Sequence, residues 1–336
     1  MEQNSQGISV VVDETRHLIG VVTDGDIRRA ILAGMDLGLP VQRLLEQKIR
    51  TSPSTPIKAE EGTTDAQLLD MMNKHRLRHI PLVNPEGQVI DLALLADLVK
   101  GYDLPMAAVI MAGGFGTRLR PLTEDLPKPM LPVGEKPIME RIIEQLRAAG
   151  IRRVNVTTHY QQDAIINYFG DGKRFGVDIR YVEEEHPLGT AGAIGLLDSI
   201  DDPLLVINGD ILTRVDFRAM LDFHHEQRAH MTVAVRQHEF HIPYGVVETS
   251  GVEITSISEK PVMRHFINAG IYLLSLESRQ FIPKGEHFDI PDLINRLISG
   301  DRRVVSFPIH EYWLDIGRHV DYKEAQRVVG GSESTE

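Results

Sequence analysis

The sequence predicts an α/β protein with a mostly parallel sheet over residues 104–330 and a smaller module before it. Three observations support this prediction: short apolar segments alternate with amphipathic ones after residue 106, an N-terminal segment is repeated, and a Gly- and Pro-containing linker separates the two parts. We expect the small module to span residues 1–103 and a polar, disordered tail to span residues 331–336. A chain of 336 residues is long enough for both parts to have cores.

The composition excludes several classes of protein and site. The net charge of −12 argues against nucleic acid or an anionic membrane as a partner. The chain has no cysteine, so disulfides, thiolate metal sites and cysteine nucleophiles are excluded. There is no signal-peptide pattern at the N-terminus and no apolar stretch near the ~18 residues that span a bilayer. We therefore expect a cytoplasmic protein with no nucleic-acid or membrane partner.

The first ~100 residues contain an internal repeat. Each copy reads as a strand, a polar turn, a second strand and a helix opened by an acidic residue, with equivalent positions 71 apart, as for Asp26 and Asp97. A helix over residues 64–75 precedes only the second copy, so the first copy looks truncated. This organisation resembles a pair of CBS repeats, which in other proteins often bind adenine nucleotides between them.

The resemblance to CBS repeats also names candidate ligands. The adenosine-binding pattern of those repeats is roughly Gly-x-x-Thr-x-x-Asp, and Gly20, Thr23 and Asp26 match it. Thr23 and Asp26 are therefore the candidate nucleotide contacts, whereas the second copy keeps only Asp97. Two roles stay open for the module: binding an adenine nucleotide, or dimerisation and docking. Because paired CBS modules tend to self-associate, we expect a homo-oligomer.

The main domain reads as strands and helices in alternation. Apolar segments predict strands, and an amphipathic segment with Pro at its first turn and Gly after it predicts a helix. The predicted strands cover residues 107–111, 154–158, 177–182 and 204–208, and the predicted helix covers residues 137–149. Such an order predicts a parallel sheet with helices on both faces, which binds ligands at the carboxyl ends of its strands.

A glycine-rich loop follows the first of these strands. Gly113, Gly114 and Gly116 let backbone N–H groups converge on an anion, and a helix after the loop would direct its positive end at the same anion. Arg118 can grip phosphate oxygens in bidentate fashion, and Lys128 stands between two prolines. The spacing matches neither a Walker A loop nor a dinucleotide-binding fingerprint. Loop and cations together predict a cradle for a triphosphate.

The same stretch resembles a known family. Gly-Gly-x-Gly-Thr-Arg-Leu-x-Pro-Leu-Thr followed by Pro-Lys-Pro-Met-Leu-Pro-Val is similar to the motif of sugar-1-phosphate nucleotidyltransferases, and the resemblance covers residues 106–329. It implies a Rossmann-like, mixed sheet of the nucleotide-diphospho-sugar transferase type. It also implies that a sugar-1-phosphate attacks a nucleoside triphosphate and pyrophosphate leaves. In this pattern Ala112, Thr117 and the three glycines bind the nucleotide, and Arg118 and Lys128 are catalytic.

Two aspartates are the candidate metal ligands. Asp210 directly follows the strand over residues 204–208, so it emerges at the ligand-binding edge of the sheet. A carboxylate facing a triphosphate is best explained by Mg²⁺, which prefers oxygen ligands. The family resemblance adds Asp315 to the same metal and makes Asp210 catalytic. Mg²⁺ is therefore the expected cofactor.

The stretch over residues 183–192 is assigned by the resemblance to the nucleobase. Gly189 permits close approach of the backbone to a flat base, and Thr190 can cap the helix that follows it. Glu184 stands where thymidylyl enzymes carry Gln, and a carboxylate can accept both donors on the pairing edge of guanine. These features favour GTP. Thymidylyl or uridylyl transfer to glucose-1-phosphate is the alternative, and a non-catalytic nucleotide sensor is a reading of a different class.

The sugar side of the site is implied by three short motifs. Tyr-Gly-Val contains Gly245, which resembles the family's glycine contact to the hexose. Glu259 and Lys260 resemble its contacts to sugar hydroxyls and sugar phosphate, and Lys260 is thereby a catalytic candidate. Asn268 and Gly270 resemble a further sugar-contacting strand. Spacing alone does not predict which sugar-1-phosphate is the substrate.

Overall fold

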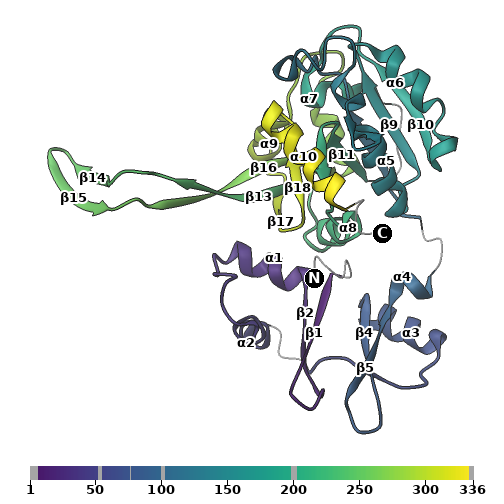
Figure 1. The fold of residues 1–336 in the computed structure, drawn as a ribbon, viewed down its shortest axis with the longest axis vertical. Helices are drawn as coiled ribbons and strands as arrows, with labels where there is room; N and C mark the ends of the chain where they lie inside the picture. Colours follow the sequence, from purple (N-terminus) through teal and green to yellow (C-terminus); the bar gives the residue numbers. More distant parts are fainter. Residues whose placement is uncertain (1–6, 52–54, 76, 100–102, 198–202, 333–336) are drawn as a thin grey trace. The chain divides into compact units, whose positions relative to one another are not determined.

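The computed structural model describes residues 7–51, 55–75, 77–99, 103–197 and 203–332. The chain divides into two compact units, residues 1–102 and 103–336, and each is considered by itself (Figure 1). In the described ranges, no helix has the length and apolar character needed to cross a membrane.

The N-terminal unit contains the two predicted repeats. Its elements are β1 (Ile8–Val12), β2 (Leu18–Thr23), α1 (Asp24–Leu32), α2 (Val41–Thr51), β3 (Ala59–Glu60), α3 (Asp65–His75), β4 (His79–Val83), β5 (Val89–Leu94) and α4 (Leu95–Leu98). Strand, turn, strand and helix recur in both copies, and α3 is the helix expected before the second copy only. The turns of the two copies meet, because the Val89 N–H donates to the Arg16 carbonyl over 2.9 Å.

The larger unit is built on a seven-stranded sheet. Its strands and α-helices are β6 (Ala107–Met111), β7 (Pro132–Val133), β8 (Lys136–Pro137), α5 (Ile138–Ala148), β9 (Arg153–Thr158), α6 (Gln162–Phe169), β10 (Asp178–Glu183), α7 (Gly189–Gly192), β11 (Leu204–Asn208), β12 (Ile211–Thr213), α8 (Phe217–Glu226), β13 (Met231–His241), β14 (Val246–Ser250), β15 (Glu253–Ser258), β16 (Val262–Leu274), α9 (Ile290–Ser299), β17 (Val304–Ile309), β18 (Trp313–Asp315) and α10 (His319–Ser332). The sheet order is β10-β9-β6-β11-β16-β13-β17. β16 runs antiparallel to both neighbours, and the other pairings are parallel. The predicted mixed, mostly parallel sheet is confirmed.

Strand β6 lies in the middle of this sheet and is buried on both faces. Ala108 and Ile110 belong to the core on the side of α5, whereas Ala107 and Val109 belong to the core on the side of α9. A strand covered on both faces is apolar at every position, which explains the continuous apolar run that predicted it. Four of the five β6 residues are at most 2% exposed.

Two local expectations differ from the structure. The element after the glycine loop is a single 3-10 turn, Thr117–Leu119, and not the α-helix expected to direct its positive end at an anion. One turn ends because Pro121 follows within two residues and cannot donate to a continuing helix. At the other end of the unit, α10 includes Gly331 and Ser332, which the sequence placed in the polar tail. The rest of that expected tail, residues 333–336, lies outside the described residues.

Candidate functional site

The carboxyl ends of four parallel strands meet at one edge of the sheet. Three backbone hydrogen bonds join the segments that follow them: from Ala112 to the Thr157 carbonyl (3.1 Å), from Glu184 to the Thr158 carbonyl (3.0 Å) and from Gly209 to the Met111 carbonyl (2.9 Å). Gly209 is required for the last contact, since a Cβ there would lie 2.7 Å from the Met111 oxygen. The glycine loop, the Glu184 segment and Asp210 therefore share one edge.

The glycine loop is held open and close to Lys128. Gly116 has φ +63°, and a Cβ on it would lie 3.2 Å from the Lys128 Cβ. The Thr123 hydroxyl donates to the Gly116 carbonyl over 2.8 Å and fixes the end of the loop. Gly114 is exposed with no atom near the position of a Cβ, so the loop backbone is accessible to a ligand.

A small two-stranded sheet brings the two predicted metal ligands together. β12 pairs antiparallel with β18, with Ile211 opposite Asp315, and the Ile316 N–H donates to the Asp210 carbonyl over 3.0 Å. Trp313 in β18 donates its indole N–H to the Ala269 carbonyl of β16 over 2.7 Å. This bond gives Trp313 a positioning role, which its apolar neighbours in the sequence did not indicate.

Charged side chains surround this aspartate pair. Lys128 donates to Asp210 Oδ2, and the Arg118 guanidinium lies 3.8 Å from where a Cβ on Gly317 would stand. Burial raises the pKa of Asp315, and the negative charge of Asp210 raises it further, against the opposing effect of Lys128 and Arg118. Four ionic side chains that are far apart in the sequence therefore converge.

The aspartate pair fits a divalent cation. Asp210 Oδ1 and Asp315 Oδ1 are buried and have no hydrogen-bond partner, although buried carboxylate oxygens are nearly always bonded. No group of three His, Cys, Asp or Glu side chains that could hold a metal is found in the described ranges. Two carboxylates suffice for Mg²⁺, which completes its octahedral coordination with substrate phosphates and water. Asp210 and Asp315 are the residues that would hold it.

Glu184 is buried against the glycine loop and is not a solvated loop residue. It is 6% exposed, and Oε2 accepts a hydrogen bond from the Leu188 N–H over 2.9 Å. Oε1 faces the loop, since a Cβ on Gly113 would lie 2.7 Å from it. The ring of His159 bonds the Glu184 carbonyl over 2.8 Å, which anchors the segment from behind.

The prediction that Thr190 caps the helix directly after it is wrong. The Thr190 hydroxyl donates to Asp289 Oδ1 over 3.0 Å and accepts from the Ile290 N–H over 2.9 Å, so it serves the start of α9 and not its own helix. α7 has only four residues and no side-chain cap. Gly189, at φ +77°, packs against the same segment, with the Phe288 carbonyl 2.8 Å from the position of a Cβ.

An aromatic residue of the loop was missed in the sequence. Phe115 is 46% exposed, and its ring lies 5.7 Å from that of His159 and 5.6 Å from that of Tyr160. The available signal was the large apolar side chain of Phe115 between two glycines, in a loop that is otherwise suited to a polar ligand. Because the ring is half exposed and belongs to the glycine loop, a flat base bound beside the loop could contact it.

The predicted sugar contacts fall into two groups. Gly270 lies beside Asn208, because a Cβ on it would be 2.7 Å from Asn208 Nδ2, and its N–H donates to Asn268 Oδ1 over 3.0 Å. Both are at the edge that carries Asp210. Gly245, Glu259 and Lys260 lie instead on a two-stranded arm that extends from the sheet (Figure 1). The structure does not bring these three to the aspartate pair of the same chain.

In the N-terminal unit, the side chains of Thr23 and Asp26 form the N-terminal cap of a helix. The Thr23 hydroxyl and the Asp26 carboxylate form the capping box of α1, with Thr23 N donating to Asp26 Oδ2 over 2.9 Å. Lys48 and Arg29 also donate to Asp26, over 2.8 and 2.5 Å. These contacts account for both residues without a bound nucleotide.

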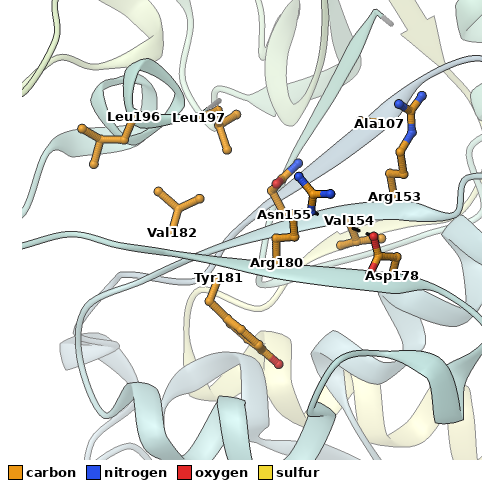
Figure 2. Close-up of a pocket in the computed structure, with 10 residues that line it drawn as sticks. All are labelled: Ala107, Arg153, Val154, Asn155, Asp178, Arg180, Tyr181, Val182, Leu196 and Leu197. Atoms are coloured by element: carbon orange, nitrogen blue, oxygen red, sulfur yellow. Dashed lines mark ion pairs between the residues drawn. The ribbon is translucent and has the colours of Figure 1, made fainter. Parts of the chain in front are cut away.

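A separate hollow of about 420 Å³ lies on the face of the sheet (Figure 2). It is lined by the first residues of β6 and β9, by β10 from Asp178 to Val182, and by Leu196 and Leu197. Parallel sheets bind ligands at the carboxyl ends of their strands, and this hollow contains neither the glycine loop nor Asp210 or Asp315. It also lacks a pair of carboxylates, since Asp178 is its single acidic residue and is 4.0 Å from Arg180.

Comparisons with known proteins identify relatives of both units. The family model described as nucleotidyl transferase matches residues 107–330, and the CBS domain model matches residues 1–33 and 50–103. The chain is 34% identical over 245 residues to a UTP–glucose-1-phosphate uridylyltransferase of Synechocystis, covering 67% of this chain and 63% of that protein. It is 35% identical over 223 residues to a mannose-1-phosphate guanylyltransferase of Mycobacterium tuberculosis, covering 64% and 62%.

A solved structure shares the fold of the larger unit. HddC from Yersinia pseudotuberculosis complexed with GMP-PN aligns with a TM-score of 0.53 at 26% identity, covering 67% of this chain and all of that one. The chain spans less than two thirds of the length of the two curated relatives. The family model covers more than half of the chain, with the glycine loop and both aspartates inside the match. The chain therefore belongs to the nucleotidyl transferase family and carries CBS repeats before the family's domain.

Proposed function

We propose that the protein is a Mg²⁺-dependent sugar-1-phosphate nucleotidyltransferase, which forms a nucleoside diphosphate sugar and pyrophosphate. The observation that carries this proposal is the pair of buried, unbonded oxygens, Asp210 Oδ1 and Asp315 Oδ1, beside a glycine loop. Buried carboxylate oxygens left without donors destabilise a site unless a cation joins them. A triphosphate on the loop would supply the remaining ligands of that cation.

The chain's own residues would bind and align two anions. The backbone of Gly113, Gly114 and Gly116 would receive the triphosphate, and Arg118 would bind the departing pyrophosphate. Lys128 offsets charge beside Asp210. The attacking oxygen of a sugar-1-phosphate is already an anion, so the reaction needs no general base, and alignment and charge neutralisation suffice. When bound, Mg²⁺ would polarise the α-phosphate and lower the repulsion between the two substrates.

GTP is the nucleotide that the site favours. Glu184 Oε2 is committed to Leu188, which leaves Oε1 facing the loop as an acceptor. Guanine presents two adjacent donors on its pairing edge, whereas thymine and uracil present one donor between two acceptors. The guanylyl relative and the HddC complex with GMP-PN support the same choice. The second substrate, to which the nucleotidyl group is transferred, would be a hexose- or hexosamine-1-phosphate.

Pyrophosphate release tests this proposal directly. The full chain is incubated with GTP, UTP, dTTP or ATP and with mannose-1-phosphate, glucose-1-phosphate or glucosamine-1-phosphate, with Mg²⁺ or with EDTA. We expect turnover with GTP and one of the sugar phosphates, and its loss in EDTA. Thermal denaturation gives an independent readout, because a nucleotide that binds the folded state raises the melting temperature.

The alternatives have their own outcomes in the same assay. Turnover with UTP or dTTP and glucose-1-phosphate, and not with GTP, would assign a uridylyl or thymidylyl transferase. No turnover with any pair, together with a melting-temperature rise given by AMP or ATP, would assign a nucleotide sensor. The CBS repeats remain candidates for adenine nucleotide binding or for dimerisation.

A further inference from the structure

The larger unit carries a two-stranded arm, defined here as residues 237–266. β13 pairs with both β16 and β17 up to Arg236, opposite Ile309, and beyond this point it pairs with β16 alone. The tip is the hairpin of β14 and β15. Figure 1 shows the arm leaving the body of the larger unit. Isolated two-stranded ribbons are marginally stable in water, so an arm of this length calls for a covering partner.

The arm exposes many apolar side chains to solvent. None of its 30 residues is buried, and it holds nine of the 22 large apolar residues that are exposed in the described chain. Two cross-strand pairs are apolar on both sides, Val247 with Ile257 and Phe240 with Met263, and each of these side chains is 44–69% exposed. Apolar residues gathered in this way mark an interaction surface.

The arm also carries a cation in a constrained backbone. Lys260 has φ +45°, a conformation that non-glycine residues seldom adopt, and it has no ion pair among the described residues. Glu259 lies beside it, with Oε2 3.1 Å from the position of a Cβ on Gly245. An unpaired lysine and a carboxylate held at a fixed turn form a small polar site inside an apolar surface.

This polar turn lies far from the aspartate pair of its own chain. Gly270 of β16 packs on Asn208, two residues from Asp210. Between Gly270 and Val262 the chain runs along β16, which at ~3.3 Å per residue separates these two residues by roughly 25 Å, and Lys260 lies two residues beyond Val262. The aspartate pair meanwhile has one of its two neighbouring cations, Lys128, engaged with Asp210. A reaction between two phosphorylated substrates needs more positive charge than Arg118 alone supplies.

We propose that two copies of this chain exchange arms, so that Lys260 and Glu259 of each copy complete the sugar-phosphate side of the other copy's site. The inference rests on the proposed nucleotidyl transfer and adds the partner that it requires. A 30-residue ribbon matches the 20–30 residues that each side of a standard interface contributes. Exchange of identical elements about a two-fold axis gives a closed dimer in which both sites are completed. The positive Lys260 is complementary to the carboxylate pair and to the substrate phosphates.

Mixed dimers test the exchange. Asp210→Asn and Lys260→Met are made in separately tagged chains, each of which alone should lose at least ~100-fold in turnover. The two chains are coexpressed, and dimers that carry both tags are purified. If arms are exchanged, one site in each mixed dimer keeps an intact Asp210 and receives an intact Lys260, so about half of the wild-type activity per dimer returns. If the arm serves its own chain, both sites are defective and the mixed dimer is inactive.

A matched control gives the opposite pattern. Wild-type chains are paired with chains that carry both substitutions. With exchanged arms, the intact core receives the defective arm and the mixed dimer is inactive, whereas an arm that folds back on its own chain leaves half of the activity. Full turnover of the Lys260→Met chain alone would overturn the proposal, because Lys260 would then have no part in the site.

A cross-link gives a readout that does not depend on activity. Because the chain has no cysteine, the double variant Arg118→Cys/Lys260→Cys carries the only two thiols. Exchanged arms predict that a short bis-maleimide links two chains into a dimer on a denaturing gel. Cross-linked monomer, or no cross-link at all, overturns the exchange even if the wild-type enzyme is active. A cross-linked dimer of the double variant, together with a wild-type protein that shows no turnover, would instead contradict the proposed function and leave the exchange standing.

Discussion

Each unit of this protein contains an aspartate beside a lysine, buried for Asp26 and partly buried for Asp210, and the two clusters differ in how their oxygens are bonded. In the N-terminal unit both oxygens of Asp26 are bonded, to Lys48, Arg29 and Thr23. Burial raises the pKa of Asp26, but these hydrogen bonds outweigh it and the net shift is downward. In the larger unit Asp210 and Asp315 each leave a buried oxygen unbonded, and the pKa of Asp315 is raised.

Under the proposed function, the difference separates a structural carboxylate, Asp26, from a pair that binds a metal. A carboxylate with all its donors in place stabilises the fold and has no capacity left for a ligand. A carboxylate that lacks donors costs stability in the free protein and regains it when a cation arrives. Residue type alone does not distinguish the two, since both clusters are an Asp with a Lys.

The largest effect is expected on activity in the larger unit. Asp210→Asn removes a ligand charge and the partner of Lys128, so turnover should fall by roughly 10³-fold. Pyrophosphate release at saturating Mg²⁺ and nucleotide measures it. Asp163→Asn, at an exposed position of α6, is the control and should keep wild-type turnover. Retained turnover in Asp210→Asn would place the metal elsewhere.

The next effect is on the stability of the N-terminal unit. Asp26→Asn removes the charge that Lys48 and Arg29 share and weakens the capping box of α1, so about 2 kcal/mol of stability should be lost. Because the folded pKa of Asp26 is lowered, its contribution is present at neutral pH and is lost as the pH falls through that value. Hydrogen exchange of the α1 amides at pH 7 and pH 4 measures both features. Equal exchange in variant and wild type would show that the cluster is not structural.

The smallest effect has the opposite sign. Asp315→Asn removes a carboxylate whose folded pKa is raised, so without metal it should increase stability at pH 7 by about 0.5–1 kcal/mol. The cost of ionising Asp315 appears as the pH rises through its folded pKa, so the gain should vanish in acid. Calorimetry in EDTA and in Mg²⁺ with GTP checks this, since only the wild type should gain from the ligands. A destabilised variant in EDTA would make Asp315 another structural aspartate.

Much of the fold could be predicted because local patterns carry it. The continuous apolar run of β6 reflects burial on both faces of the sheet, and the helical spacing of apolar residues in α5 reflects burial of one face. The repeat in the N-terminal unit is visible as a constant offset of 71 residues between equivalent positions. The helix expected after the glycine loop is a single 3-10 turn, because Pro121 cannot donate to a longer helix. The position of Asp210 also followed from sequence, since it directly follows an apolar strand.

The rest depends on contacts between distant residues. Lys128 meets Asp210 across 82 positions, and Thr190 meets Asp289 across 99, so neither pairing leaves a local pattern. The arm was missed for a related reason. A strand that leaves its sheet keeps the same alternation as one that stays inside it, and the alternation does not tell where the neighbouring strand ends.

The pairing of β12 with β18 also sets when the site can exist. Asp315 reaches Asp210 only through a strand near the end of the domain. During synthesis the glycine loop and Asp210 leave the ribosome long before β18 does. A growing or prematurely terminated chain that lacks β18 therefore cannot bring Asp315 to Asp210, and the proposed metal site is complete only once this strand has been made.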